Sequence, residues 1–291
     1  MAKSKTVLSA LLVMLLWGSL FSFVKLGYGE YGIVSTGDIL FFAGVRFFIC
    51  GAIICVFAFL RNRKSFVPVK FAIVPVLCAG LFSIVLHYAF TYLGLSLTDS
   101  SKTAILKQIG VLFYVCFSWV FFRDDRVTWK KILGAVLGFA GIIAINSGAG
   151  KISFSFGDAL IVAASFCTVA ANIISKRVFR TVEPIVSTGV SQLFGGIALL
   201  VVGMLLGGKM SFSLNSSAFI MIYICIASVI SYCIWFIIVK SEELSRLFII
   251  KFAEPVFAAV FGALLLGENI FCPQYAISFI LIAAGICISN K

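Results

Sequence analysis

Long apolar runs alternate with short polar connections along the whole chain. Ten windows of about 20 mostly apolar residues, the length of helix that crosses a bilayer, can be placed in it. They cover residues 6–27, 38–60, 71–93, 101–122, 130–147, 158–175, 184–206, 217–239, 246–266 and 273–290. Because the connections are short, neighbouring helices should run antiparallel. The pattern predicts an all-α integral membrane protein with ten transmembrane helices.

The composition agrees with a lipid environment. Hydrophobic residues make up 62% of the 291 residues, charged residues only 12%, and the mean hydropathy is +1.16. No polar stretch is long enough to form a separate soluble domain. The formal charge of +12 lies in short clusters between apolar runs, so the expected partner is the lipid bilayer and not nucleic acid.

One apolar stretch occurs twice. Residues 104–124 lie 144 positions before residues 248–268 (248 − 104 = 144), and the two align without a gap. The same register holds outside these windows. It pairs Lys107 with Lys251, Phe113 with Phe257, Tyr88 with Tyr232 and Gly141 with Gly285. We interpret residues 1–150 and 151–291 as two copies of a five-helix unit, separated by the Gly/Ser-rich residues 147–157.

The basic residues predict the orientation of the helices. They cluster in connections on one predicted side of the membrane, which makes that side cytoplasmic. The clusters are Arg61, Arg63, Lys64 and Lys70; Arg123, Arg126, Lys130 and Lys131; and Lys176, Arg177 and Arg180. Both termini are then cytoplasmic, in a multi-pass protein of the cytoplasmic membrane. Because five is odd, the second copy enters the membrane from the opposite side, as in the inverted repeats of secondary transporters.

Two lysines are the leading candidates for substrate contacts. Lys107 and Lys251 occupy equivalent positions in the two copies, inside apolar runs where a charge is costly. Each could extend to the membrane surface or pair with an acid, and Glu254, three residues on, is the expected partner of Lys251. Facing a shared cavity, they would attract an anion or a carboxylate. Tyr114 lies on the Lys107 face, seven residues on.

Glu254 and Pro255 form a second candidate. Proline lacks the amide that would bond the Lys251 carbonyl, so it should kink the ninth helix. The kink either shapes packing or marks a hinge at a binding site, with Pro255 as the hinge. Glu254 would then bind an ammonium group or carry a proton.

Aromatic and polar side chains at membrane depth complete the candidate site. Ser228, Ser231, Tyr232 and Trp235 share one face of the eighth helix, which suits a cavity wall or contacts between helices. The other candidates are Trp17, His87, Tyr88 and Asn172, of which His87 can also be a buried core group. Arg46, in the second helix, is assigned a structural ion pair with Asp38 or Glu30.

The chain resembles EamA-type transporters of the drug/metabolite transporter superfamily. The resemblance spans the whole chain and rests on four segments. They are Trp17-Gly18-Ser19 leading to Lys25, Gly44-Val45-Arg46-Phe47, Glu254-Pro255-Val256-Phe257 leading to Leu266-Gly267-Glu268, and Gly285. The first copy has Gly110-Val111 where the second has Glu254-Pro255. The resemblance implies a ten-helix carrier of small metabolites that works by alternating access.

We therefore predict a secondary transporter, not an enzyme, for a small polar metabolite with an anionic or carboxylate group. The alternative is an exporter of amino acids or cationic drugs in which Glu254 is the key charge. The sequence lacks the continuous polar stripe that a channel would need, and no nucleotide-binding, hydrolase or metal pattern is present. The nine cysteines form no C-x-x-C pair, and no cofactor is expected. Protons or a counter-substrate are the expected coupling partners, and the sequence sets no oligomeric state.

Overall fold

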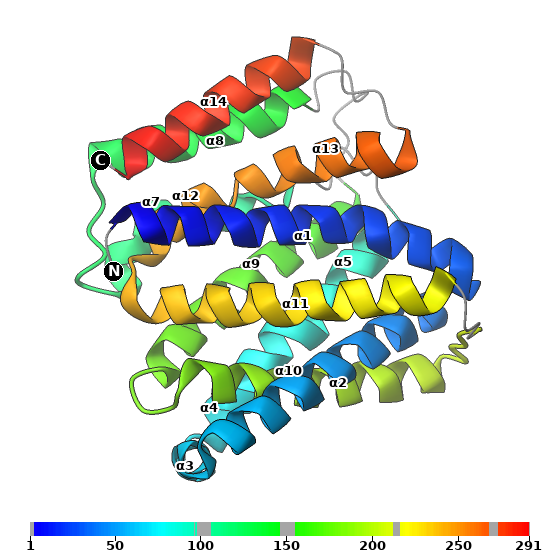
Figure 1. The fold of residues 1–291 in the computed structure, drawn as a ribbon. Helices are drawn as coiled ribbons and strands as arrows, with labels where there is room; N and C mark the ends of the chain where they lie inside the picture. Colours follow the sequence, from blue (N-terminus) through cyan, green and yellow to red (C-terminus); the bar gives the residue numbers. More distant parts are fainter. Residues whose placement is uncertain are drawn as a thin grey trace. The chain divides into compact units, whose positions relative to one another are not determined.

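The structure is a computed structural model that describes residues 3–95, 97, 106–145, 155–211, 216–267 and 273–290. The described residues form helices joined by turns (Figure 1). The α-helices are α1 (Lys3–Tyr31), α2 (Thr36–Arg61), α3 (Val67–Phe71), α4 (Ile73–Gly80), α5 (His87–Leu95), α7 (Ile109–Phe121), α8 (Trp129–Ile145), α9 (Phe156–Val178), α10 (Pro184–Leu205), α11 (Ser216–Ser241), α12 (Leu244–Ile250), α13 (Ala253–Leu266) and α14 (Pro273–Ser289). A 3₁₀ turn, η1 (Arg63–Phe66), precedes α3, and a π-helical segment, η2 (Leu81–Leu86), joins α4 to α5. Most of the predicted connection 147–157 lies outside the described residues.

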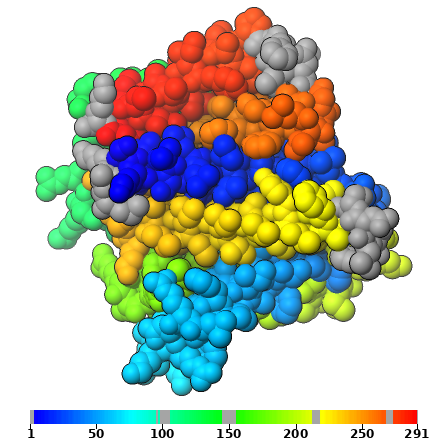
Figure 2. All heavy atoms as spheres, in the orientation of Figure 1, coloured from blue at the N-terminus to red at the C-terminus, as the bar shows by residue number. Residues whose placement is uncertain are grey.

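The described helices fit a membrane protein. Seven are long and apolar enough to span a bilayer, counting α4–η2–α5 and α12–α13 as one span each, and α7 and α14 are shorter apolar helices. Large apolar side chains on α2 and just beyond it face outward: Phe57 is 55% exposed, Leu60 79% and Phe71 89%. The space-filling view shows this cyan segment at the molecular surface (Figure 2). The all-α integral membrane class is therefore confirmed, while the number of ten helices stays a prediction.

The contacts divide the chain into two compact units. Unit 1 contains residues 1–22, 93–169 and 241–291, and unit 2 contains residues 23–92 and 170–240. Each unit combines segments of both predicted halves of the chain. The two predicted sequence repeats, residues 1–150 and 151–291, divide the chain differently from these units, and they stay a prediction.

Unit 2 is built on a close pair of helices, α2 and α10 (Figure 1). A Cβ atom at Gly44 would lie 2.5 Å from the Leu200 amide nitrogen, and one at Gly203 would lie 2.5 Å from that of Phe41. The backbones therefore touch at positions that only glycine permits. Residues with higher numbers in α2 contact residues with lower numbers in α10, so the two helices run antiparallel. Adding 144 to the residue numbers of α2 (36–61) gives a range that contains α10 (184–205), so the two helices correspond in the sequence register.

Unit 1 contains the corresponding pair, α8 and α14, which lie side by side in Figure 1 (green and red). A Cβ atom at Gly134 would lie 2.7 Å from the Gly285 carbonyl oxygen, and one at Gly141 would lie 2.7 Å from Ile282. This pair is antiparallel as well. α14 begins 144 positions after α8 begins and ends 144 positions after α8 ends.

Two of the predicted helices are divided by turns. The predicted helix 246–266 consists of α12 and α13, separated by a turn at Lys251 and Phe252. The predicted helix 101–122 is described from residue 106 and contains a turn at Lys107 and Gln108 before α7. The windows of hydropathy do not detect these turns, because the turn residues interrupt the hydrogen bonds of the helix without interrupting its apolar character.

Candidate functional site

The first helix interruption, directly before α7, is fixed by a serine of α9. The Lys107 carbonyl oxygen accepts a hydrogen bond from Ser165 Oγ at 2.6 Å. The same Oγ accepts a hydrogen bond from the Gly110 amide at 2.7 Å. A Cβ atom at position 110 would lie 2.5 Å from Ser165 Oγ, so this approach requires glycine. Ser165 thus satisfies backbone groups that the interruption leaves without helical partners.

The second interruption, at Lys251 and Phe252, is built differently. The Lys251 carbonyl accepts a hydrogen bond from the Glu254 amide at 3.0 Å. Pro255 is the third residue of α13, within the first turn, where an amide has no partner inside its own helix. The predicted kink is therefore a turn between two helices, and the Lys251 carbonyl that the proline was expected to free is occupied.

One face of α1 lies against both lysines. Lys251 Nζ lies 5.1 Å from the centroid of the Trp17 ring, and Lys107 Nζ lies 5.5 Å from that of Phe21. Trp17 and Phe21 are four residues apart and share a face of the helix. Both distances are within the range of cation–π attraction. A Cβ atom at Gly18 would lie 2.6 Å from Phe257 Cβ, so the glycine beside Trp17 allows α1 to reach α13.

Glu254 lies near both lysines without pairing directly with either. Among the described residues it has no ion pair, although it interacts electrostatically with Lys107 and with Lys251. The predicted pair between Lys251 and Glu254 is wrong because the turn removes the helical spacing on which it depended. Lys107, Lys251 and Glu254 are all half-buried, and two positive charges oppose one negative charge.

Tyr114, predicted to share the face of Lys107, is fully buried in another cluster of unit 1. Its hydroxyl donates to Asp125 Oδ2 at 3.1 Å, and its ring lies 5.0 Å from that of Phe248. The turn at residues 107–108 again removes the helical spacing on which the prediction relied. The structure thus brings together Trp17, Lys107, Lys251 and Glu254, but gives the Tyr114 hydroxyl to Asp125.

Asp125 fixes the start of α12. Its carboxylate accepts hydrogen bonds from the Ser245 amide at 3.0 Å, from Ser245 Oγ and from Lys131 Nζ at 2.8 Å. Lys131 Nζ also pairs with Glu243 at 3.0 Å. Asp125 is 1% exposed and Lys131 2%, so this ion pair is shielded from solvent.

Unit 2 contains the aromatic candidates. The hydroxyl groups of Tyr88 and Tyr232 lie 3.4 Å apart, and the ring of Phe47 lies 4.8 Å from that of Tyr88 and 6.1 Å from that of Tyr232. His87 packs edge-on against Tyr88, with ring centroids 5.1 Å apart. Tyr88 and Tyr232, which the sequence register pairs, therefore meet in space.

Two further candidates form a buried pair in the same unit. Trp235 Nε1 donates to Asn172 Oδ1 at 2.8 Å, and both side chains are at most 4% exposed. This bond joins α11 to α9. Asn172 thus satisfies the only polar atom of the Trp235 ring.

The predicted ion pair of Arg46 is also wrong. The arginine is 4% exposed, its Nε donates to Ser228 Oγ at 3.0 Å, and its guanidinium carbon lies 4.9 Å from the Phe47 ring centroid. Among the described residues it pairs with neither Asp38 nor Glu30. Asp38 instead caps its own helix, accepting hydrogen bonds from the Ser35 amide at 2.8 Å and the Lys209 amide at 2.7 Å. Ser35-x-x-Asp38 is a capping box, a sequence signal that should have excluded the pair.

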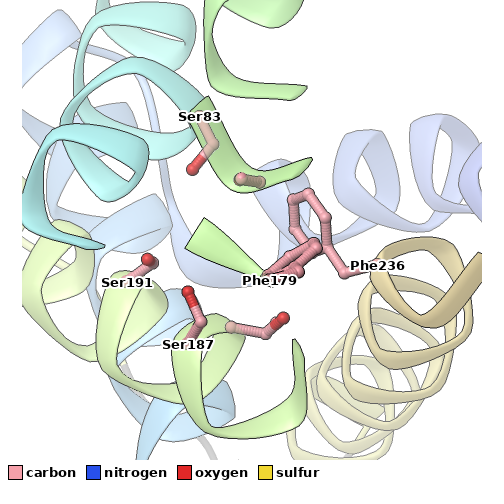
Figure 3. A pocket seen from close by; sticks show the side chains of 7 residues that line it. Ser83, Phe179, Ser187, Ser191 and Phe236 are labelled. Atoms are coloured by element: carbon pink, nitrogen blue, oxygen red, sulfur yellow. The ribbon is translucent and has the colours of Figure 1, made fainter. Parts of the chain in front are cut away.

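A small hollow of about 10 Å³, room for about one water molecule, lies within unit 2 (Figure 3). Five hydroxyl side chains and two phenylalanine rings surround it: Ser83, Ser175, Ser187, Thr188, Ser191, Phe179 and Phe236. Thr188 donates to the Pro184 carbonyl and Ser191 to that of Val76. The hydroxyls of Ser83, Ser175 and Ser187 have no hydrogen-bond partner in the described part of the chain. Ser83 comes from η2, and π-helical segments are frequent at functional sites.

Metal ligands are not gathered in the described part of the chain. No group of three or more His, Cys, Asp or Glu side chains could hold an ion there. The cysteines that the structure describes are free thiols. The site chemistry therefore consists of ammonium, guanidinium, carboxylate, phenol and hydroxyl groups.

Comparison with known proteins adds the family. The profile of the EamA-like transporter family matches twice, over residues 4–147 and 155–291. The chain belongs to the EamA-like transporter family. The sequence segments that carry the resemblance to this family have physical roles in the structure. Gly18 and Gly44 permit close helix contacts, while Arg46 and Glu254 carry charge at the two clusters described above.

Relatives of this EamA-like protein are transporters by name. An "Uncharacterized transporter" of Archaeoglobus fulgidus is 24% identical over 295 residues, covering 99% of this chain and 98% of the relative. A "Probable amino-acid metabolite efflux pump" of Escherichia coli K12 is 25% identical over 292 residues, covering 96% and 93%. One solved crystal structure shares the fold with a TM-score of 0.79 and 22% identity, over 98% of this chain and 96% of the other. The EamA-like chain is thus a transporter rather than an enzyme.

Proposed function

We propose that the protein is a secondary transporter that moves a small metabolite with an anionic or carboxylate group across the cytoplasmic membrane by alternating access. The observation that carries the proposal is the equivalent placement of Lys107 and Lys251. Each lies at a two-residue helix interruption, 144 positions apart, against the same face of α1. A charge in an apolar span is costly, so two of them at equivalent breaks favour a substrate role over chance.

The helix ends beside the lysines also favour an anion. α7 begins two residues after Lys107, and α13 begins two residues after Lys251. Neither helix is capped by the side chain of its own N-cap residue, although Ser165 of α9 accepts a hydrogen bond from the Gly110 amide in the first turn of α7. The positive end of each helix dipole therefore adds to the field of the neighbouring ammonium group. Broken helices that direct their N-termini at an anionic group are typical of transporter sites.

The antiparallel pairs support an inverted repeat as the basis of alternating access. α2 packs against α10 and α8 against α14, in each case the helix expected from the register of 144. Helices that correspond in sequence but run in opposite directions are what inverted copies produce. We propose cytoplasmic termini from the basic clusters, Pro255 as the flexing position, and energy from a gradient of protons or a counter-substrate.

Unit 2 contains aromatic and polar side chains that suit contact with a solute. Tyr88 and Tyr232 form a polar contact between rings, with His87 packed against Tyr88, while Trp235 is held by Asn172. Phenol groups beside aromatic faces suit a solute with both polar and apolar parts. We propose these residues as solute contacts or as the second layer behind them.

A second candidate is the export of amino acids or their metabolites. Glu254 near two lysines offers a partner for an ammonium group beside partners for a carboxylate, which suits a zwitterion. The named efflux pump among the relatives favours the same substrate class. Uptake of a simple carboxylate in preference to an amino acid would separate the two candidates.

The test is transport by the purified protein in liposomes, using Lys107→Gln and Lys251→Gln. Candidate solutes are carboxylates, amino acids and the esters of both, which lack the carboxylate charge, and Lys64→Gln, at an exposed connection, is the control. Loss of one charged contact should weaken apparent affinity for the anion by about 10- to 100-fold. Unchanged affinity and flux in both variants would refute the lysine site. Non-saturable flux without counterflow in the wild type would refute a carrier.

A further inference from the structure

The starting observation is an arginine that is buried without a counter-charge among the described residues. Arg46 is 4% exposed and forms one hydrogen bond among the described residues, from Nε to Ser228 Oγ. A guanidinium has five N–H donors, so its terminal nitrogens make no hydrogen bond to the described part of the protein. Ser228 is itself held by the Ile224 carbonyl, so the serine fixes the guanidinium but carries no negative charge.

The guanidinium cannot escape this cost by losing its proton. Arginine stays protonated in proteins, whereas a buried lysine can become neutral. Among the described residues, the groups around Arg46 are uncharged: the Phe47 ring, the Ser228 hydroxyl, the thiol of Cys50, and the phenols of Tyr88, Tyr92 and Tyr232. Buried charges are otherwise paired, so the arrangement is incomplete without an anion.

The surroundings define the kind of anion. A guanidinium presents two parallel N–H groups that match the oxygens of a carboxylate. A single guanidinium balances one negative charge, whereas a phosphate monoester carries more. Phe47, Tyr88 and Tyr232 pack with ring centroids 4.8 and 6.1 Å apart, which favours a solute with an apolar or aromatic body. The two phenol hydroxyls can donate to the same carboxylate.

The hydroxyl-lined hollow is connected to this cluster by a contact between two aromatic rings. The Tyr232 ring lies 6.2 Å from that of Phe236, which lines the hollow opposite Ser187 and Ser191 (Figure 3). Ser228, Tyr232 and Phe236 recur every four residues along α11, so they follow one face of it. The same helix face therefore leads from the guanidinium to a hollow lined by hydroxyls, three of which have no hydrogen-bond partner among the described residues.

We propose that Arg46, positioned by Ser228 and flanked by Tyr88 and Tyr232, binds the carboxylate of a monoanionic solute that carries an aromatic or apolar body. Arg46 then forms an anion subsite within unit 2. Its role in translocation rests on the proposed transport function, but its role in binding does not.

The test measures binding to the purified full chain, so it does not depend on flux. Phenylacetate and benzoate are the probes, methyl phenylacetate is the uncharged control and phenyl phosphate is the more highly charged control. Calorimetry and thermal shift are compared for the wild type, Arg46→Gln and Arg46→Lys. Arg63→Gln is the matched control, since Arg63 stacks on Phe59 at 4.4 Å but is exposed.

The wild type should bind a carboxylate in preference to the ester and the phosphate. Arg46→Gln should weaken this binding by about 10- to 100-fold, and Arg46→Lys should restore only part of it. The melting temperature of ligand-free Arg46→Gln should be unchanged or higher, because an uncompensated buried charge has been removed. A structural arginine predicts the reverse: a lower melting temperature with unchanged binding.

Several outcomes would overturn the proposal. Carboxylate binding equal to wild type in Arg46→Gln, or no carboxylate binding by the wild type, would do so. If Arg46→Gln fails to fold, Ser228→Ala and Tyr88→Phe decide, and unchanged affinity in both refutes the subsite. Arg46-dependent binding without any saturable transport refutes the proposed function alone. Transport that needs the lysines but binding that ignores Arg46 refutes the subsite alone.

Discussion

The two helix interruptions of unit 1 occupy equivalent positions but are stabilised in different ways. At the first, Ser165 bonds both the Lys107 carbonyl and the Gly110 amide, at 2.6 and 2.7 Å. At the second, the Lys251 carbonyl is bonded within its own segment by the Glu254 amide at 3.0 Å, and Pro255 follows. A neighbouring helix therefore holds the first interruption, while the second depends on its own residues.

The difference suggests separate mechanical roles. The first interruption is tied to α9 and should keep its geometry when the protein changes state. The second has a proline and an acid where the first has Val111 and Gly110, and it joins α13 to a short helix, α12, whose start is fixed by Asp125. We infer that α13 moves relative to α12, and that the first copy serves as the fixed reference.

The largest expected effect comes from removing the anchor of α12. Asp125→Ala would leave the ammonium group of Lys131, which is 2% exposed, with only Glu243 as its carboxylate partner. Breaking a buried pair from one side costs about 3–5 kcal/mol, so we expect a large fall in melting temperature in detergent.

The control for this prediction is Asp124→Ala, since Asp124 is the exposed neighbour of Asp125. It should change the melting temperature little. Equal effects of the two substitutions would show that Asp125 does not anchor α12.

A smaller loss of stability is expected at the first helix interruption, which Ser165 holds. Gly110→Ala would place a methyl group 2.5 Å from Ser165 Oγ and 2.8 Å from the Ser165 carbonyl oxygen. Since one of these contacts is backbone, α7 and α9 must separate, at a cost of about 1–3 kcal/mol. Thermal unfolding should show the loss.

Gly29→Ala is the matched glycine control, because a Cβ atom there meets nothing within 4 Å. It should preserve or slightly raise stability, as alanine favours a helix. If Gly110→Ala were equally harmless, the contact with Ser165 would not hold the first interruption.

The smallest effect on stability, but a specific effect on rate, is expected at Pro255. Pro255→Ala supplies an amide that can bond the Lys251 carbonyl and so favours a continuous helix through the turn. Because proline in the first turn is tolerated, stability should change by less than about 1 kcal/mol. Transport in liposomes should slow several-fold without a matching loss of substrate affinity.

Pro273→Ala, at the first residue of α14, is the control for proline removal at a helix start. It should leave the transport rate unchanged. A Pro255→Ala protein that transports at the wild-type rate would argue against a hinge in the second interruption.

The sequence predicted the membrane class, because it depends on local composition, while the cavity-facing role of Lys107 and Lys251 stays a prediction. It missed the turn at Lys107, since neither Gly110 nor Val111 breaks a helix by itself. The turn could nevertheless have been predicted, because the register of 144 aligns this part of the first copy with Pro255 in the second. It also misassigned Tyr114, because a helical face has meaning only where the helix is continuous.

Arg46 shows a different limit. The sequence offered two acids as partners, and choosing between ion pairing and helix capping required the Ser35-x-x-Asp38 pattern to be read first. The contacts of Arg46 with Ser228 and Phe47, and the hollow beyond Tyr232, bring together helices distant in the sequence. Local patterns cannot predict such contacts, because they depend on how α2, α5, α10 and α11 pack.

The close glycine contacts between α2 and α10 and between α8 and α14, here called the glycine seams, make the sequences of the two halves depend on each other. Gly44 has the Leu200 backbone against it, and Gly134 has that of Gly285, so neither half can drift at these positions without a matching change in the other. Each seam joins helices from either side of the chain's midpoint. A gene cut there would encode two fragments that bury these glycines only when both are made in the same cell and inserted together.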